Sequence, residues 1–285
     1  MAPEVVKETE VVKEAPKSEV EALEENLPSA AAAVHQLIRE DGEKEMRRKF
    51  RALLWSAIAG GITMSTSMLA RAILAAHLPD TDPAFLIESA GYTVGFILVI
   101  ATGQQLFTEN TVTPVLPLMT SPTWRNLGKV GRLWGVVLAG NIIGGAIAAA
   151  VFAFLPMFSA NVDAAMIEIG EGLMENTAFE MFSKGIVAGW LIATLVWTLR
   201  SFESWAFVMI FLVTYLVALG DFTHIIVGTI EVLYLIFLGQ LEIAPAIFRF
   251  GIPTLLGNVV GGAFIFALIS HAQVQADVDH SRPAQ

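Results

Sequence analysis

One histidine, His224, stands inside a long apolar stretch of the chain, where an ionisable side chain is unusual. Asp221 and Thr223 precede it, and Glu231 follows seven residues later, about two helical turns away, so that His224 and Glu231 could share a helix face. An ionisable group inside a membrane segment is costly and commonly marks a substrate pathway or a proton relay. His224 is therefore the first candidate for a transport residue; an imidazole satisfied by a backbone carbonyl is the structural alternative.

A second polar group interrupts another apolar stretch and contains Thr108, Glu109 and Asn110. Thr108 and Asn110 could supply neutral hydrogen-bonding groups to the same pathway, or they could cap a half-helix that begins there. We expect Glu109 at the cytoplasmic mouth of the pathway.

Lys184 begins a further apolar stretch, directly after an acidic connection. It could draw anions into an outer vestibule, or lie at the membrane interface as an ordinary lysine. The sequence has no cysteine and no HExxH motif, which excludes disulfides and the common metal-site patterns. We expect no enzymatic activity, no metal, no cofactor and no nucleic-acid partner.

The elements that hold these residues are predicted to be membrane-spanning helices. The chain has 285 residues, of which 55% are hydrophobic and only 15% are charged, so a lipid bilayer is the expected solvent. A span needs about 20 apolar residues, and six stretches qualify: 52–76, 90–119, 133–155, 183–199, 206–239 and 251–271. The second and the fifth are too long for one crossing and carry the polar groups named above. The sequence therefore predicts an all-α membrane protein with six transmembrane helices, of which helices two and five are broken.

The remaining segments flank this transmembrane domain, residues 52–271. Residues 1–28 are rich in charge and poor in aromatic residues, which is typical of a disordered cytoplasmic tail. Residues 29–51 have an apolar face and a basic face and predict an amphipathic helix on the membrane surface, or else a solvated helix leading into the first span. Residues 272–285 are expected to be a cytoplasmic C-terminal tail.

Orientation follows from the basic residues beside the spans. The segment before the first span and the second and fourth connections are basic, whereas the first connection has no Lys or Arg. The positive-inside rule then places both termini in the cytoplasm. Arg71, near the outer end of the first span, is expected to reach the interface.

An internal repeat is visible in the third and sixth spans, which both read GNxxGGA, at Gly140–Ala146 and Gly257–Ala263. The broken stretches also match, with Phe107–Thr108–Glu109 against Phe222–Thr223–His224. Each repeat has an odd number of spans, so two inverted three-helix repeats are predicted, as in many transporters. The motif is expected to serve close helix packing through small residues; its packing residues are Gly140, Asn141, Gly144, Gly257, Asn258 and Gly261.

Several of these motifs together resemble the formate/nitrite transporter family over residues 29–273. The residues that carry the resemblance are Gly103, Leu106, Phe107, Thr108, Asn141, Lys184-Gly185-Ile186, Trp190-Leu191 and His224. The resemblance is closest to the YfdC-like branch of that family, for which LFTENTVTPVLP, RLWGVVLAGN and ALGDFTHIIVG look characteristic.

The resemblance implies an aquaporin-like protomer in a homopentamer, each protomer with its own pore for formate, nitrite or a similar small monovalent anion, in a bacterial inner (plasma) membrane. It implies that His224 is the central pore residue and that Thr108 faces it, with Lys184 in the outer vestibule. The implied constrictions are formed by Tyr92 on the outer side and by Phe96, Leu106 and Phe107 on the inner side. Relatives usually read F-E-H-S-x-x-N around the histidine, and this chain lacks that Glu, Ser and Asn.

The predicted function is a channel or proton-coupled transporter for small monovalent anions or their conjugate weak acids. An anion in a dry pore loses much hydration energy, so crossing as a neutral acid is cheaper, and we expect a proton supply near His224. Two alternatives remain: an aquaporin-like pore for neutral solutes, although neither break contains Asn-Pro-Ala, and a membrane scaffold that does not transport.

Overall fold

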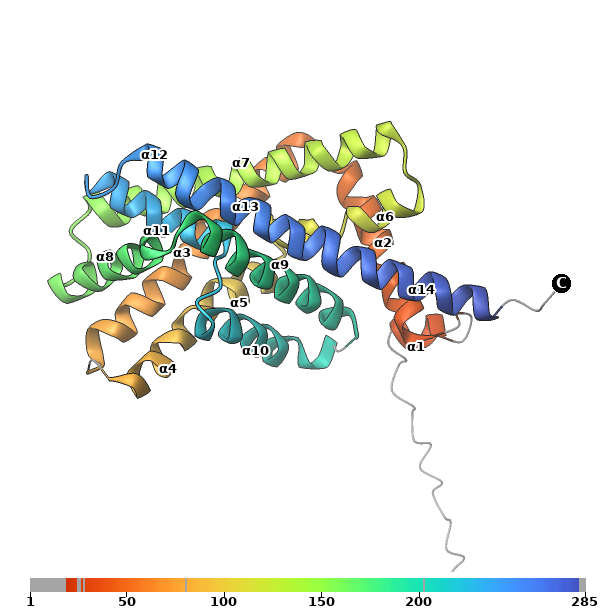
Figure 1. Ribbon diagram of the computed structural model, residues 1–285, viewed down its shortest axis with the longest axis horizontal. Helices are drawn as coiled ribbons and strands as arrows, with labels where there is room; N and C mark the ends of the chain where they lie inside the picture. Colours follow the sequence, from red (N-terminus) through yellow and green to blue (C-terminus); the bar gives the residue numbers. More distant parts are fainter. Residues whose placement is uncertain (1–18, 25–26, 28, 80, 202, 282–285) are drawn as a thin grey trace, which may run out of the picture.

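The computed structural model describes residues 19–24, 27, 29–79, 81–201 and 203–281, and within them the chain forms helices and turns without a strand (Figure 1). Most of the tail expected over residues 1–28 and the last four residues of the chain lie outside the described part. A short helix, α1 (Glu19–Glu24), precedes the main bundle.

The bundle is built from helices whose bounds are α2 (Ala30–Arg47), α3 (Phe50–His77), α4 (Asp82–Gly91), α5 (Thr93–Ala101), η1 (Glu109–Thr111), α6 (Val115–Thr120), α7 (Trp124–Phe154), α8 (Ala160–Glu175), α9 (Ala178–Ser201), η2 (Glu203–Trp205), α10 (Ala206–Leu219) and α11 (Ile225–Phe237). One long final helix changes its winding along its length and comprises α12 (Ile243–Pro245), η3 (Ala246–Gly251), α13 (Ile252–Val259), η4 (Val260–Ala267) and α14 (Leu268–Ser281). It therefore continues through the start of the segment expected to be a C-terminal tail.

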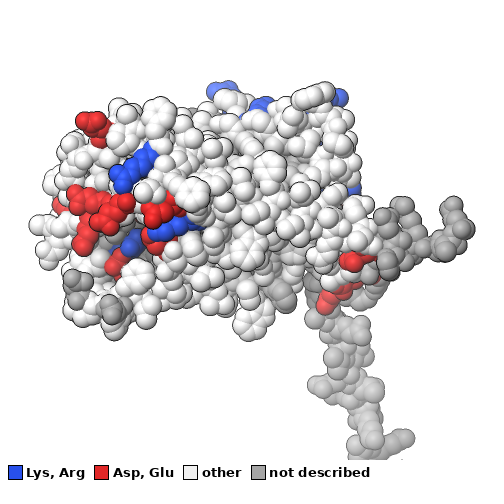
Figure 2. All heavy atoms as spheres, viewed as in Figure 1, with Lys and Arg blue, Asp and Glu red and all other residues white. Residues whose placement is uncertain are grey.

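Within the described residues, five helices are long and apolar enough to cross a membrane: Phe50–His77, Pro83–Ala101, Trp124–Phe154, Ala178–Ser201 and Ile243–Asp277. The shorter helices α10 and α11 are equally apolar and follow one another across a break. Large apolar side chains such as Trp55, Phe207 and Phe264 are more than half exposed. Figure 2 shows a broad surface free of charged side chains in the middle of the molecule. Such a surface suits lipid rather than water.

Two segments interrupt the bundle at the polar groups singled out above. The first runs over residues 102–108, between α5 and η1, and the second over residues 220–224, between α10 and α11. Each contains a residue with left-handed backbone, Gly103 at φ 63° and Asp221 at φ 48°. A left-handed residue directly after a helix turns the chain out of it, which glycine does freely and aspartate tolerates.

Helix α8 lies in the third connection, for which the sequence suggested no helix. It buries apolar side chains at helical spacing, among them Val162, Met166, Ile169 and Leu173, and packs on α3 and α11. An apolar face of this kind is the signal of an amphipathic helix, and the acidic residues of the connection obscured it.

Helix α2 covers the opposite end of the bundle from α8 (Figure 1). Its hydroxyl cap is Ser29, which accepts a hydrogen bond from the Ala32 N–H, and its buried side chains include Val34, Ile38 and Met46. Helix α2 contacts α6, α9 and α14; Val34 and Ile38 pack in one apolar cluster, and Met46 belongs to the main core. Part of the apolar face expected over residues 29–51 is thus covered by the rest of the protein.

Candidate functional site

His224 and Thr108 meet at the centre of the bundle, one from each break. Their side chains are joined by a 2.7 Å hydrogen bond between Thr108 Oγ1 and His224 Nε2, and both residues are buried. The other ring nitrogen, Nδ1, accepts a hydrogen bond from the Val227 N–H at 3.4 Å, so the imidazole caps α11. Because Nδ1 accepts, the proton of the neutral ring resides on Nε2 and is donated to Thr108. The Thr108 hydroxyl therefore binds His224 and makes no capping bond to η1.

Aromatic and aliphatic side chains surround this pair. The Phe96 ring stands edge-on to the His224 ring with 5.0 Å between centroids, and the Tyr92 ring lies 5.4 Å from that of Phe96. Leu106 and Phe107 are buried on the Thr108 side, and Phe107 packs against Trp134. Of the four residues expected to form constrictions, Phe96 contacts the His224 ring and Tyr92 contacts Phe96, while Leu106 and Phe107 directly precede Thr108 in the first break.

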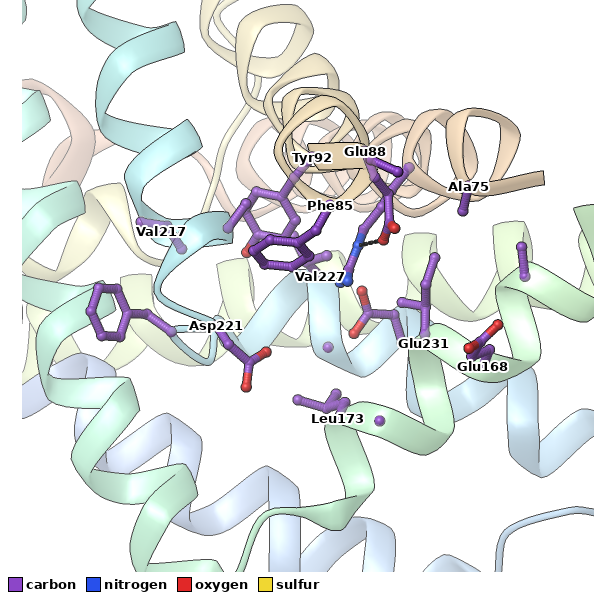
Figure 3. Close-up of a pocket in the computed structure, with 18 of the residues that line it drawn as sticks. Ala75, Phe85, Glu88, Tyr92, Glu168, Leu173, Val217, Asp221, Val227 and Glu231 are labelled. Atoms are coloured by element: carbon purple, nitrogen blue, oxygen red, sulfur yellow. Dashed lines mark hydrogen bonds and ion pairs between the residues drawn. The ribbon is translucent and has the colours of Figure 1, made fainter. Parts of the chain in front are cut away.

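A cavity of about 490 Å³ opens on one side of the pair, and we call it the α8 cavity because α8 forms one of its walls (Figure 3). His224 and Tyr92 lie at its inner end. Figure 3 shows the carboxylates of Glu88, Asp221 and Glu231 turned toward the same hollow. The cavity is thus polar and acidic up to the aromatic residues beside His224.

A second cavity, of about 430 Å³, lies on the other side, and we call it the α2 cavity because α2 forms one of its walls. Gln105, Glu109 and Asn110 line it. Glu109 has a buried carboxylate oxygen without a hydrogen-bond partner in the described part of the chain, and the Asn110 amide donates to Gln105 Oε1 and to the Leu106 carbonyl. Both residues thus line this cavity, and no hydrogen bond joins either of them to His224 in the described part of the chain.

Asn141 and Asn258 do more than the helix packing expected of them. The Asn141 amide donates to the carbonyls of Ala57 and Gln105 and accepts from the Phe107 N–H. The Asn258 amide likewise donates to the carbonyls of Gly185 and Thr223 and accepts from the Ile225 N–H. Each asparagine therefore satisfies backbone groups that a break leaves unpaired. The two breaks are stabilised in the same way, each by one asparagine side chain.

The glycines of the two GNxxGGA motifs lie close to neighbouring helices. A β-carbon on Gly144 would lie 2.1 Å from the Ile58 carbonyl oxygen, and one on Gly261 would lie 2.0 Å from the Ile186 carbonyl oxygen. Gly140 and Gly257 face α3 and α9 at similarly short range. Only glycine permits this approach of α7 to α3 and of the final helix to α9.

The correspondence between the two breaks differs from the one read off the sequence. The residues held by Asn141 are Gln105 and Phe107, and those held by Asn258 are Thr223 and Ile225. Phe107 therefore corresponds to Ile225 rather than to Phe222, and His224 takes the place of Leu106.

Lys184 is not a free cation at the cavity. Its Nζ donates to Asp221 Oδ2 at 2.5 Å and to Asn176 Oδ1 at 2.7 Å, and it does not belong to the lining of the α8 cavity. Lys184 is connected to the α8 cavity only indirectly, because its ion-pair partner Asp221 lines that cavity.

Arg71, rather than Lys184, lines the α8 cavity. The sequence suggested that Arg71 reaches the membrane interface, but its side chain lines the α8 cavity and its Nε donates to Glu88 Oε1 at 2.6 Å. The sequence contains a signal for this pair: Arg71 lies near the end of the first span, and the oppositely charged Glu88 lies just before the second. The side chain turns inward because the Glu88 carboxylate offers it a partner there.

No group of three or more His, Asp or Glu side chains that could hold a metal occurs among the described residues. The arrangement instead has two polar cavities that face a narrow, mostly apolar centre with one hydrogen-bonded pair across it. Such a shape can admit a small solute from either side and force it to shed water at the centre.

Comparison with known proteins gives consistent matches. A family model described as formate/nitrite transporter matches residues 32–272. The inner membrane protein YfdC of Escherichia coli (strain K12) is 52% identical over 266 residues, which cover 93% of this chain and 86% of that protein. The formate channel FocA of Haemophilus influenzae is 28% identical over 207 residues, covering 62% of this chain and 70% of that protein. A solved pentameric formate channel with formate bound has a TM-score of 0.68 and 19% identity, covering 80% of this chain and 98% of that structure.

Proposed function

The chain belongs to the formate/nitrite transporter family and is an integral membrane protein, and from this premise we propose that it carries small monovalent anions, or their conjugate weak acids, across the membrane. The observation that carries the proposal is the His224–Thr108 hydrogen bond, 2.7 Å long, set between two cavities. A solute passing from one cavity to the other has to displace this bond and replace it with its own polar atoms. The pair is thereby both barrier and binding group.

The two halves of the chain are, in our proposal, inverted repeats that meet at this pair. Matching contacts support this: Asn141 and Asn258 hold the two breaks, and Gly144 and Gly261 pack on α3 and α9. Repeats that share contacts but enter the membrane from opposite sides place a substrate site where their broken helices meet. The broken pair α10 and α11 then serves as the sixth crossing, beside the five long helices.

The surface helices α2 and α8 extend this proposed symmetry beyond three helices in each repeat. Arg132 donates to the carbonyls of Met46 and Arg48 at the C-terminal end of α2, and Arg249 donates to the carbonyls of Glu175 and Asn176 at the C-terminal end of α8. An arginine that satisfies the carbonyls at a helix end stabilises that end. Each repeat is thus better described as a surface helix followed by three crossings.

Passage as a neutral acid fits the centre of the pathway. Phe96 packs on the His224 ring, and the buried Leu106 and Phe107 directly precede Thr108; none of the three offers a charge to an anion that has lost its water. Transfer of an unpaired carboxylate into such a place costs several kcal/mol or more. Protonation in a cavity before the centre removes most of that cost, so transport is coupled to a proton.

We further propose a homopentamer in an inner (plasma) membrane, with both termini in the cytoplasm, so that the α8 cavity faces outward and the α2 cavity inward. The pentameric formate channel among the similar structures supports the number, and the inner membrane protein YfdC supports the membrane. The basic residues near α2 and at the start of α7 support the orientation.

The proposal is tested by uptake into proteoliposomes. We expect labelled formate and nitrite to enter at rates well above those of protein-free liposomes, whereas osmotic swelling in glycerol should match the protein-free rate. Rapid glycerol entry without formate or nitrite entry would instead identify a pore for neutral solutes. No entry of any of the three would favour a scaffold.

A further inference from the structure

The α8 cavity is acidic, although the solutes proposed for it are anions. Its wall carries the carboxylates of Glu88, Glu168, Asp221 and Glu231, and Arg71 is the basic residue among the described residues that line it. Two of these carboxylates have cationic partners, because Glu88 pairs with Arg71 and Asp221 pairs with Lys184. Glu168 is exposed. The residue left to explain is Glu231.

Glu231 is buried without a partner. Only 4% of its surface is exposed, and its carboxylate makes no hydrogen bond or ion pair with the described part of the chain. Glu231 lines the α8 cavity one helix turn beyond Val227. Val227 also lines the cavity, and its N–H donates a hydrogen bond to the His224 ring. Figure 3 shows the Glu231 carboxylate pointing into the hollow beside Val227. A purely structural carboxylate at this depth would be hydrogen-bonded.

Arg71 lines the same cavity and has hydrogen-bond donors that are not used within the described part of the chain. Its Nε bonds to Glu88, while its two terminal nitrogens have no partner among the described residues. Arg71, Asp221 and Glu231 line the same cavity. A guanidinium with free nitrogens is well suited to hold a carboxylate or a similar small anion through charge-assisted hydrogen bonds.

We propose that Arg71 and Glu231 form an outer proton-transfer site, in which the Arg71 guanidinium binds a small monovalent weak-acid anion and Glu231 gives that anion a proton before it enters the aromatic centre. The inference rests on the proposed function and locates its proton source within the cavity that also holds His224.

The step balances within the cavity. The O–H bond of the Glu231 carboxylic acid breaks, its electron pair stays on Glu231 as a carboxylate, and a new O–H bond forms on a lone pair of the anion. The neutral acid moves on toward His224 and Thr108, and the Glu231 carboxylate regains a proton from the water of the cavity. Anion binding and proton binding reinforce one another, as any two coupled ligands must.

The other titratable and charged residues that line the α8 cavity are less suited than Glu231 to give the proton. Those facing it from the neighbouring elements are Arg71 on α3, Glu88 on α4, Tyr92 after α4, Glu168 on α8, and Asp221 and His224 in the break. Helix α7 presents Gly145 to α11 at Ile230 and contributes no residue to the described lining. Both nitrogens of His224 are already engaged, and Glu88 and Asp221 are paired.

The first test compares pH profiles of formate uptake into proteoliposomes holding the full chain. The variant Glu231→Gln keeps the shape and removes the transferable proton, so its uptake should follow the concentration of undissociated acid and fall about tenfold per pH unit. The parent should fall less steeply, so that the parent-to-variant ratio rises from near one at pH 5 to at least ten at pH 7. Glu231→Asp, which restores a proton, should keep the parent's profile.

The matched control is Glu171→Gln, which removes the same charge from an exposed position on α8 outside the cavity, and its profile should overlap the parent's. The proposal is overturned if Glu231→Gln has the parent's profile, or if Glu231→Asp is as impaired as Glu231→Gln. A parent that transports no anion overturns the proposed function itself, and this inference with it.

The second test concerns binding by Arg71. The double variant Arg71→Gln with Glu88→Gln removes both members of the ion pair, so that neither of the two charges is left without the other. We expect the half-saturating formate concentration to rise at least fivefold. An unchanged half-saturating concentration in a protein that still transports would overturn the role of Arg71.

Discussion

The imidazole of His224 has both nitrogens occupied, by the Thr108 hydroxyl and by the Val227 N–H. It therefore joins the two breaks and at the same time caps one half-helix. A group in this position senses any solute that enters the centre, because the solute competes for a hydrogen bond that the buried ring cannot replace with water.

Replacing Thr108 with valine tests this link. Thr108→Val keeps the side-chain shape but leaves the His224 Nε2–H buried without a partner, which costs about 1–3 kcal/mol. We expect formate uptake to change at least tenfold and thermal stability to fall. Thr194→Val is the control, since Thr194 is partly exposed and its hydroxyl bonds, among the described residues, to the Trp190 carbonyl of its own helix. Equal behaviour of the two variants would remove Thr108 from the pathway.

At the same scale, the sequence was a good guide to residue types and a poor guide to partners. An ionisable residue in an apolar stretch is conspicuous, so His224 could be selected from the sequence, whereas the family resemblance was needed to imply that Thr108 faces it. Arg71 and Lys184 are both cations near the ends of spans, and nothing in their local sequence says which lines a cavity. That choice depends on Glu88 and Asp221, which only the folded chain brings to them.

Among the elements, the contacts of α7 with α3 and of the final helix with α9 position both breaks. Glycine brings the helices close enough for one asparagine amide to reach a third segment. Asn141 and Asn258 could have been suspected of this role, because they recur at the same place in both motifs. Their hydrogen bonds could not be predicted, since they join segments far apart in the chain.

The close contact between α7 and α3 can be tested by replacing two glycines of α7, one at a time. Gly144→Ala forces a methyl group against the Ile58 carbonyl, so it should destabilise the protein by about 1–3 kcal/mol and lower formate uptake. Gly131→Ala places its methyl group where no atom lies within 4 Å, so it should leave stability unchanged or slightly raised. Thermal unfolding in detergent measures both. A harmless Gly144→Ala would mean that the close approach is dispensable.

Helix α2 is predicted to loosen in acid. His35 bonds to His271 Nδ1 at 3.0 Å, and burial, with the nearby His271 and Arg39 charges, lowers the pKa of His35 from 6.5 to about 4. Because the depressed pKa disfavours the charged ring, the docked state is fully stable above pH 6.5 and loses stability as the pH falls from 6.5 toward 4. Hydrogen exchange over residues 30–47, corrected for its intrinsic pH dependence, should increase over that window.

The control is His35→Gln, which keeps a hydrogen-bonding side chain without that titration and should show a weaker acid response. Identical exchange in parent and variant across the window would show that His35 does not control the docking of α2.

For the whole molecule, the all-helical membrane fold was within reach of the sequence because long apolar stretches have few alternatives in a bilayer. Helix α8 was not, since its acidic face resembles a solvated loop when read residue by residue. Its apolar face becomes clear only against α3 and α11. The α8 cavity, and with it the place of Glu231, was missed for the same reason.

The assembly is predicted to be a homopentamer. Native mass measurement of the purified protein should give a mass near five times 30.7 kDa, because large apolar side chains remain exposed on each protomer and the similar solved channel is pentameric. A monodisperse trimer or tetramer would contradict this assignment.

The central claim is that a small weak acid crosses this protein together with a proton, through the centre marked by His224 and Thr108. The most direct measurement follows labelled formate and internal pH at once in proteoliposomes whose membrane potential is set with potassium and valinomycin. The account predicts formate uptake faster than in protein-free liposomes, acidification of the lumen by one proton for each formate, and no dependence on the potential. Formate uptake that follows the potential without acidifying the lumen would contradict it.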